Sequence, residues 1–195
     1  MNVLLTGGAG YIGSHAALSL LDSGHKVHII DDLSTGNEML IPHNAQFTNC
    51  NINNEKKVSD ILKAKKFDLL MHFAGFIQVE ESVKYPKKYF ENNTNNAIKL
   101  FNVCKNNGLN KIVFSSTAAA YGNVSENNLI DENTNLNPQN PYAESKIRTE
   151  KFLLDNKDSF KFIILRYFNV AGADKNLRSG QISKKSTHLI KILSE

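Results

Sequence analysis

The chain has 195 residues, 41% of them hydrophobic, which is enough for one substantial core and favours a single domain. Its 23 basic and 19 acidic residues give a net charge of +4 without any block of like charges, which argues against nucleic acid as a partner. Cys50 and Cys104 belong to no CxxC pair or clustered His/Cys set, so neither a metal site nor a disulfide framework is predicted.

The N-terminus lacks the pattern of a secretory signal peptide. It enters an apolar run at Val3 almost at once, without a basic segment before it. No later segment approaches the roughly 18 to 20 apolar residues that a membrane-spanning helix needs. We therefore expect a cytoplasmic protein with no membrane partner.

Short apolar runs alternate with longer amphipathic stretches, which is typical of repeated βα units. Strands are predicted at Asn2–Thr6, Lys26–Ile30, Asp68–Phe73, Lys111–Ser115 and Phe160–Arg166. Helices are predicted at Ile12–Ser23 and Pro86–Asn107, and each is followed by a glycine, Gly24 or Gly108, suited to a left-handed helix end. The alternation predicts an α/β fold with a Rossmann-like, doubly wound parallel sheet.

The later part of the chain has a different character. The Asn-rich segment 121–140 has little periodicity and is predicted to be a long surface excursion. From Gly172 onward the strand pattern stops, and Ser186–Leu193 resembles a helix that is cut off rather than capped. We therefore expect the chain to end within its architecture.

A glycine-rich turn follows the first predicted strand directly. The sequence Gly7-Gly8-Ala9-Gly10-Tyr11-Ile12-Gly13 places glycines at Gly7, Gly10 and Gly13. Glycines permit a tight turn and a close approach of backbone N–H groups to a pyrophosphate, and the helix N-terminus favours an anion. The turn therefore predicts a dinucleotide site, and a glycine-rich turn without a ligand is the alternative.

The second predicted strand leads into Asp31, eighteen residues after Gly13. At this position an acidic side chain accepts hydrogen bonds from the adenosine ribose, and it would repel the extra phosphate of NADP. NAD is the predicted cofactor for this reason. The alternative is that Asp31 and Asp32 only cap the following loop.

A tyrosine and a lysine are predicted to lie one helical turn apart. Asn140 is suited to a helix N-cap and Pro141 to the first helical position, so Tyr142 and Lys146 should share one helix face. We expect a nearby ammonium, together with the positive nicotinamide ring, to favour the phenolate. Tyr142 is therefore the predicted general base. YxxxK is a common string, and an exposed helix face is the alternative.

The predicted strand Lys111–Ser115 runs into two hydroxyl residues, Ser116 and Thr117. The carboxyl ends of parallel strands are where open α/β sheets bind ligands, so a hydroxyl there is placed to contact the reacting oxygen. The alternative is that Ser116 and Thr117 cap a turn or a helix.

Taken together, the motifs resemble the extended short-chain dehydrogenase/reductase superfamily, and within it most closely the UDP-glucose 4-epimerases. The resemblance covers essentially all of the chain. It depends on VLLTGGAGYIGSH (3–15), DDLSTG (31–36), HFAG (72–75), ENN (91–93), FSSTAAAYG (114–122), NPYAESK (140–146) and LRYFNVAGA (165–173).

The resemblance implies a role for many single residues. Beside the glycines, it implies NAD contacts from Tyr11, Ile12, Asp31, Asp32, Leu33, Ser34, Thr35, Gly36, Asn51, Ile52, Phe73, Ala74, Gly75, Phe76, Ile77, Asn92, Lys146 and Phe168. It implies that Tyr142 is the base, that Thr117 contacts the sugar hydroxyl, and that Asn169 contacts the UDP-sugar substrate. Two positions depart from the pattern: Asn51 replaces a usual aspartate near the adenine, and Ile77 replaces a lysine of some members.

Members of the superfamily run to roughly twice a single-domain length. We therefore expect 1–170 to be the NAD-binding domain and 171–195 to be the start of a truncated substrate-binding region, with most of the C-terminal substrate domain missing. The resemblance also implies a homodimer at full length, formed through helices that correspond to 86–107 and 142–156.

Two other functions stay open. A nucleotide-sugar 4,6-dehydratase needs an Asp-Glu pair after the threonine, whereas this chain has Ala118 and Ala119, so it lacks the acid and base for eliminating water. A catalytically silent NAD-binding module is the alternative outside enzymes. Turnover of UDP-galactose distinguishes this module from the epimerase, because both bind NAD.

Overall fold

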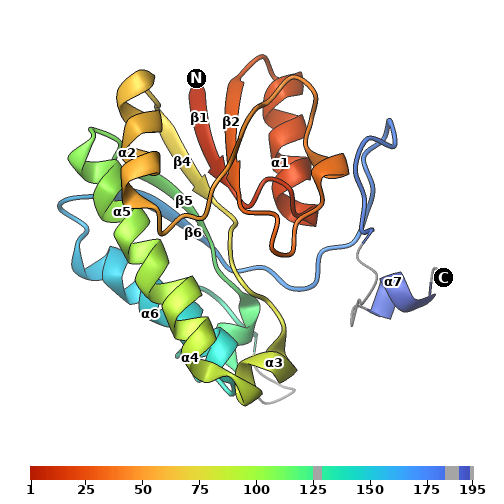
Figure 1. The fold of residues 1–195 in the computed structure, drawn as a ribbon. Helices are drawn as coiled ribbons and strands as arrows, with labels where there is room; N and C mark the ends of the chain where they lie inside the picture. The colour runs from red at the N-terminus through yellow and green to blue at the C-terminus, as the bar shows by residue number, and fades with distance from the viewer. Residues whose placement is uncertain (125–128, 183–188, 194–195) are drawn as a thin grey trace.

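The computed structural model describes residues 1–124, 129–182 and 189–193 (Figure 1). In these residues the strands form one parallel sheet in the order β3-β2-β1-β4-β5-β6, which confirms the predicted Rossmann-like fold. The strands are β1 (Asn2–Thr6), β2 (Lys26–Asp31), β3 (Gln46–Asn49), β4 (Leu69–His72), β5 (Lys111–Ser115) and β6 (Lys161–Leu165).

All five predicted strands are present, with ends that shift by a residue or so. Strand β3, which pairs with β2 at one edge of the sheet, was not predicted. Its four residues, Gln-Phe-Thr-Asn, contain no apolar run, and none of them is fully buried. An edge strand that buries so little leaves no periodic signal in the sequence.

The helices are α1 (Tyr11–Asp22), α2 (Glu55–Ala64), α3 (Val79–Lys84), α4 (Pro86–Tyr89), α5 (Asn96–Asn106), α6 (Pro141–Asp155) and α7 (Leu189–Leu193). The predicted helix Pro86–Asn107 is interrupted, because a π-helical turn, η2 (Phe90–Asn95), joins α4 to α5. Gly24 and Gly108 have φ angles of +77° and +83°, which confirms the left-handed backbone after α1 and α5. Helix α2 was not predicted.

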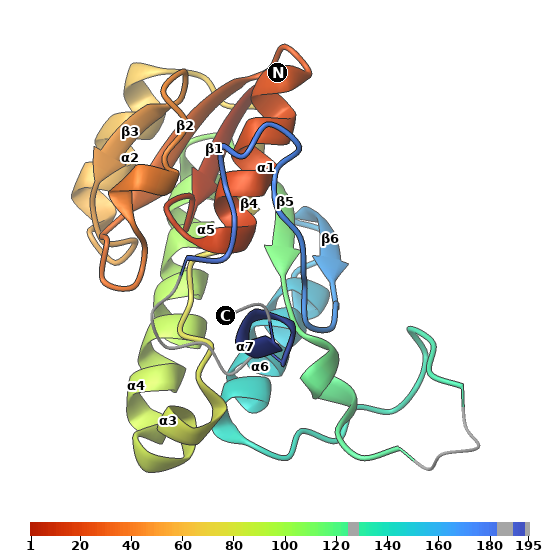
Figure 2. The same cartoon turned by 90° about the vertical axis from the view of Figure 1, so that its right-hand side faces the viewer.

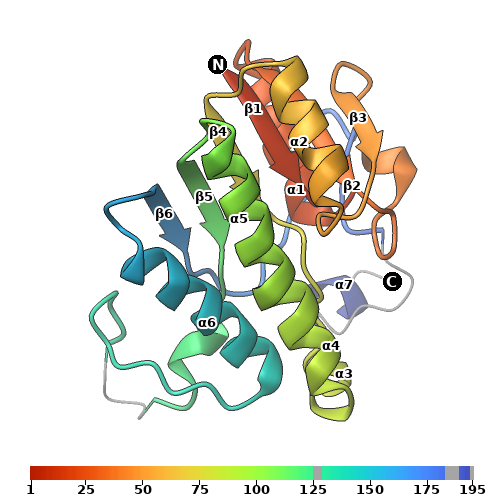
Figure 3. The ribbon, with the colours of Figure 1, turned by 60° about the vertical axis from the view of Figure 1, so that its left-hand side comes forward.

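Helices cover both faces of the sheet, as Figure 3 shows. On one face α2, α5 and α6 bury a cluster that includes Val58, Leu100 and Leu153 against Leu4 and Ile112 of the strands. On the other face α1 packs its Ala17 near Leu5, Val27 and Ile29 of β1 and β2. Each large apolar side chain buried in this way contributes about 1.5–3 kcal/mol.

Strand β6 forms the edge of the described sheet opposite β3, and one of its faces is exposed. Ile163 and Leu165 are 59% and 37% exposed, although both are large apolar residues. Beyond β6 the chain returns to α1, where the Tyr11 hydroxyl donates to the Gly172 carbonyl at 2.6 Å. Arg178 also forms an ion pair with Asp22 at 2.7 Å, so this returning segment is anchored to α1 (Figure 2).

The predicted surface excursion, 121–140, leaves the body of the molecule after a short 3-10 turn, η3 (Ala118–Tyr121), and residues 125–128 lie outside the described residues. The Asn137 N–H donates to the Ala120 carbonyl at 3.0 Å, so the two ends of the excursion meet. Of the predicted helix Ser186–Leu193, residues 189–193 form α7 and 186–188 lie outside the described residues. None of the described helices is long and apolar enough to cross a membrane.

Candidate active site

The predicted site residues gather at the carboxyl edge of the sheet. Gly7 follows β1, Asp31 ends β2, Phe73 follows β4, and Thr117 lies two residues beyond β5. The direction of the strand order reverses between β1 and β4: β2 and β3 lie on one side of β1, whereas β5 and β6 lie on the other side of β4. Such a turning point is where open α/β sheets form a ligand crevice.

The glycine turn is packed too tightly for side chains. A Cβ on Gly13 would lie 2.1 Å from the Gly7 carbonyl oxygen, and one on Gly7 would lie 2.4 Å from the Ala74 nitrogen. The turn therefore holds α1 close to β1 and also touches the segment after β4. No side chain caps α1 at Gly10, so the first-turn N–H groups of this helix keep their capacity for an anion.

Asp31 organises the loop after β2. Its carboxylate accepts from the Ala9 N–H at 3.0 Å and from the Leu33 N–H at 2.9 Å, which fixes it between the glycine turn and the 31–36 loop. Burial raises the pKa of Asp31, and the two backbone hydrogen bonds oppose that effect. Each carboxylate oxygen has a second lone pair, so Asp31 retains acceptor capacity.

Asn51 and Asp32 form a second contact in this loop. The Asn51 side-chain amide donates to the Asp32 carboxylate at 2.5 Å, and the Ser34 N–H donates to the same carboxylate at 3.0 Å. Burial raises the pKa of Asp32, but these hydrogen bonds outweigh it and the pKa is lowered. An aspartate in place of Asn51 would put two carboxylates side by side. The asparagine avoids this repulsion and donates a hydrogen bond to Asp32 instead.

Helix α6 presents Tyr142 and Lys146 as the sequence predicts. Asn140 caps it by accepting from the Ala143 N–H at 2.9 Å, and Pro141 occupies the first turn. Tyr142 is partly buried and is hydrogen-bonded to Thr117 across from β5. The structure therefore brings together the three residues that were predicted to be catalytic.

Lys146 is 3% exposed and donates to the Ser115 carbonyl at 3.0 Å. Burial lowers its pKa to about 8, and the negative charge of Glu150 opposes this effect. Burial also raises the pKa of Tyr142, and the hydrogen bond with Thr117 opposes the rise. We expected the Lys146 ammonium to lower the pKa of Tyr142, but in the chain without cofactor this pKa is raised. The reason is that the Lys146 ammonium donates to the end of β5 and the phenol is desolvated.

The segment 73–77 lies beside Lys146, where a Cβ on Gly75 would be 3.2 Å from the lysine nitrogen. Asn93 of η2 holds this segment, since its amide accepts from the Phe76 N–H and donates to the Phe76 carbonyl, both at 2.9 Å. Asn92 donates to Asn93 at 3.0 Å. Sequence reasoning missed Asn93, although the paired asparagines of the ENN motif contained the signal.

Other predicted site residues are exposed to solvent. Phe168 is 75% exposed and Ile77 is 59% exposed, and Asn169 is exposed beyond β6. Tyr167, which was not predicted, is hydrogen-bonded through its hydroxyl to Ser115, and the negative form of Tyr142 is among the causes that raise its pKa. It thus belongs to the same cluster of hydroxyl groups.

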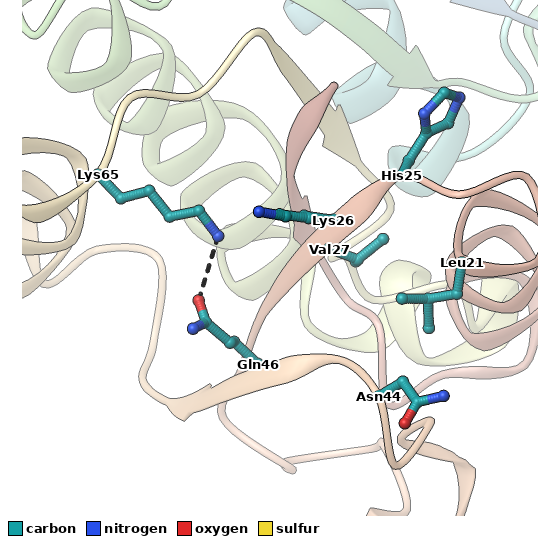
Figure 4. A pocket seen from close by; sticks show the side chains of 7 residues that line it. All are labelled: Leu21, His25, Lys26, Val27, Asn44, Gln46 and Lys65. Atoms are coloured by element: carbon teal, nitrogen blue, oxygen red, sulfur yellow. Dashed lines mark hydrogen bonds between the residues drawn. The ribbon is translucent and has the colours of Figure 1, made fainter.

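Of two hollows among the described residues, one borders the predicted site. A hollow of about 150 Å³ is lined by Tyr11, Ile12, His15 and the 170–173 segment, next to the glycine turn. A larger hollow of about 480 Å³ lies by Lys26 and Gln46, the first residues of β2 and β3 (Figure 4). It is at the amino ends of the strands, so it is separate from the crevice. No cluster of metal-binding side chains occurs among the described residues.

Comparison with known proteins agrees with this geometry. Residues 3–195 match the sequence profile of the NAD dependent epimerase/dehydratase family. The chain belongs to this family. It is 45% identical to a UDP-glucose 4-epimerase from Azospirillum brasilense over 192 residues, which are 97% of this chain and 55% of that protein.

Solved structures of this epimerase/dehydratase family superpose closely. A UDP-glucose 4-epimerase crystal structure gives a TM-score of 0.95 at 39% identity, with 100% of this chain and 59% of that chain covered. The enzyme from Stenotrophomonas maltophila, with bound NAD and formylated UDP-arabinopyranose, gives 0.92 at 31% identity, with 98% and 60% covered. The predicted family, fold and dependence of the family on NAD are confirmed, and the chain spans little more than half the length of these relatives.

Proposed function

We propose that this chain is the NAD-binding part of a nucleotide-sugar 4-epimerase that interconverts UDP-glucose and UDP-galactose. The observation that carries the proposal is the placement of Tyr142 against Thr117, with buried Lys146 one helical turn away, at the carboxyl edge of a parallel sheet. This is the location where such a sheet binds its ligands. Hydroxyl, phenol and ammonium groups in one crevice suit the movement of a proton at a sugar hydroxyl.

The residues present fit NAD. The uncapped start of α1 offers N–H groups to the pyrophosphate, and the buried Asp31 carboxylate offers an acceptor to the adenosine ribose. Asp31 also disfavours a phosphate on that ribose, so the proposal specifies NAD rather than NADP. When bound there, NAD would supply a reversible hydride acceptor for C4 of the sugar, so the reaction would involve no net oxidation.

The protein's own groups move the proton. In the proposed reaction Tyr142 accepts the proton of the C4 hydroxyl and later returns it, while Thr117 contacts the same sugar oxygen. Burial raises the pKa of Tyr142, so the phenolate needs a positive partner. Lys146 is the cation nearest in sequence on that helix face, and the nicotinamide ring is the second.

We propose glucose and galactose as the sugars because of the 45% identity to the UDP-glucose 4-epimerase from Azospirillum. Formylated UDP-arabinopyranose in the Stenotrophomonas relative makes an arabinose epimerase the nearest competing function. A dehydratase is disfavoured, because Ala118 and Ala119 have no acidic group. A silent NAD-binding module remains the competing function outside enzymes.

A longer protein would complete the site. We propose that 1–170 form the NAD-binding domain and 171–195 begin the substrate-binding region, in which Asn169 and later residues contact the UDP-sugar. The exposed apolar face of β6, with Ile163 and Leu165, is the surface expected to receive further chain. A homodimer through α5 and α6 is part of the same proposal.

The test uses the chain continued to the length of its relatives, with UDP-galactose and UDP-arabinose as separate substrates. Tyr142→Phe should keep NAD bound and lose ~100- to 10,000-fold of the turnover of UDP-galactose, because it removes a general base. Glu144→Gln, on the exposed side of the same helix, is the matched control and should keep normal turnover. Near-normal turnover by Tyr142→Phe would overturn the assignment, and faster turnover of UDP-arabinose would replace the proposed sugar.

A further inference from the structure

A buried carboxylate on α6 joins the three segments that carry the proposed site. Glu150 lies one helical turn after Lys146 and is 1% exposed. Its carboxylate accepts from the Ser116 hydroxyl, just past the end of β5. It also accepts from the Arg166 guanidinium, which donates to one oxygen at 2.6 Å and, through Nε, to both oxygens at 3.1 Å. Both carboxylate oxygens are therefore in use.

Arg166 extends the contact to the turn that begins at Thr117. Its Nη1 donates to the Tyr121 hydroxyl at 3.0 Å, and its guanidinium lies 5.2 Å from the centre of the Tyr121 ring. Tyr121 closes η3, and Thr117 caps the start of η3 by accepting from the Ala119 N–H at 3.1 Å. Turn η3 is therefore linked to Glu150 of α6 at both ends, through Ser116 just before it and through Tyr121 and Arg166 at its end.

The same carboxylate determines the charge near Lys146. From α6 the group that faces the lysine is Glu150, and from β4 it is His72, which is fully buried. Burial and the nearby Lys146 lower the pKa of His72 to about 3, so this ring is neutral at pH 7. Burial lowers the pKa of Lys146 to about 8, and only the charge of Glu150 opposes it.

We propose that Glu150 is a positioning residue: its buried carboxylate, one helical turn from Lys146, is the counter-charge of that ammonium and, through Ser116 and Arg166, holds Thr117 beside Tyr142. This inference rests on the proposed function, since the charge on Lys146 and the position of Thr117 matter only for the proposed proton transfer by Tyr142. A purely structural ion pair would tie α6 to β6 without any effect on the ionisation of Lys146 or Tyr142.

Two variants that break the same ion pair separate these possibilities. Glu150→Gln removes the negative charge that opposes the effect of burial on Lys146, so the pKa of Lys146 should fall by about one pH unit or more. Arg166→Gln removes the cation and leaves the carboxylate, so the pKa of Lys146 should stay or rise. Glu144→Gln, which breaks an exposed ion pair with Arg148 on the same helix, is the control and should change nothing.

The measurement is an NMR titration of the lysine side chains of the 195-residue chain, with Lys146 assigned from Lys146→Met. A lower Lys146 pKa in Glu150→Gln, together with an unchanged or higher Lys146 pKa in Arg166→Gln, supports the proposal. Equal displacements in the two, or no displacement in Glu150→Gln, would overturn it, because either result means that the pair is only structural.

Ser116→Ala supplies a milder variant that keeps both charges of the pair. It releases Ser116 from Glu150, so Thr117 should lose its fixed place and the pKa of Tyr142 should rise further, measured by phenolate absorbance. An unchanged Tyr142 titration in a folded Ser116→Ala chain would overturn the positioning of Thr117. Both titrations use no cofactor, so a wild-type chain that fails to bind NAD would count against the proposed function and not against this inference.

Discussion

Replacement of Gly13 by alanine reverses the usual effect of this substitution in a helix. Gly13 is in the first turn of α1, where an alanine would ordinarily stabilise by about 0.5–1 kcal/mol. Here the new Cβ would lie 2.1 Å from the Gly7 carbonyl oxygen and 2.9 Å from the Gly7 carbonyl carbon. The two segments must therefore separate by roughly 1 Å to reach ordinary contact.

That separation has a definite cost. The Gly7 carbonyl also accepts from the Gly10 N–H at 3.1 Å, and the Gly7 N–H donates to Ile30 of β2 at 3.0 Å. Overpacking a rigid site costs about 1–3 kcal/mol, and a weakened backbone hydrogen bond adds about 0.5–1.5 kcal/mol. After subtraction of the helix gain, Gly13→Ala should lower the free energy of unfolding by about 2 kcal/mol, or about 4–8 °C in Tm.

Thermal and urea unfolding of the two chains measure this difference. Gly10→Ala in the same turn is the control, because its Cβ would meet only the Gly7 oxygen, at 3.3 Å, and should cost no more than about 1 kcal/mol. A Gly13→Ala chain that is as stable as the wild type, or more stable, would refute the packing argument for the glycine turn.

Three further predictions concern ionisation and chain length. The pKa of His72 is lowered from 6.5 to about 3, so between these values the unfolded chain binds a proton that the folded chain does not. The free energy of unfolding should therefore fall by about 1.4 kcal/mol per pH unit below 6.5, and less steeply in His72→Leu. Thr117→Val should raise the pKa of Tyr142, and an unchanged phenolate titration would count against their hydrogen bond. The 195-residue chain should turn over UDP-galactose at least ~100-fold more slowly than a chain of its relatives' length, and equal rates would show a complete substrate site.

Patterns that are local in the sequence predicted the fold well. The glycine turn, the helix start at Asn140 and Pro141, and the apolar runs of β1 and β5 each specify backbone geometry within a few residues, and the structure agrees with all of them. Edge strand β3 and the π-helical turn η2 were missed, because the first buries almost nothing and the second differs from an α-helix only in its hydrogen-bond register.

The site itself was predicted less completely. A motif singles out each of Tyr142, Lys146 and Thr117, and the fold places all three at the carboxyl end of β5; their catalytic roles stay predictions. The roles of Glu150 and Arg166 depend on contact between α6 and the end of β6, which no local pattern encodes. Likewise, the rise in the pKa of Tyr142 follows from burial in the folded chain, and burial of one side chain is a tertiary property.

The most direct test of the central claim is a calorimetric titration of the 195-residue chain with NAD and, separately, with NADP. We predict that NAD binds at one site per chain and clearly more tightly than NADP, because the buried Asp31 carboxylate accepts from a ribose hydroxyl and repels a phosphate. Asp31→Asn should reduce that preference. Equal affinity for the two cofactors, tighter binding of NADP, or no binding of NAD would contradict the assignment of this chain as an NAD-binding domain.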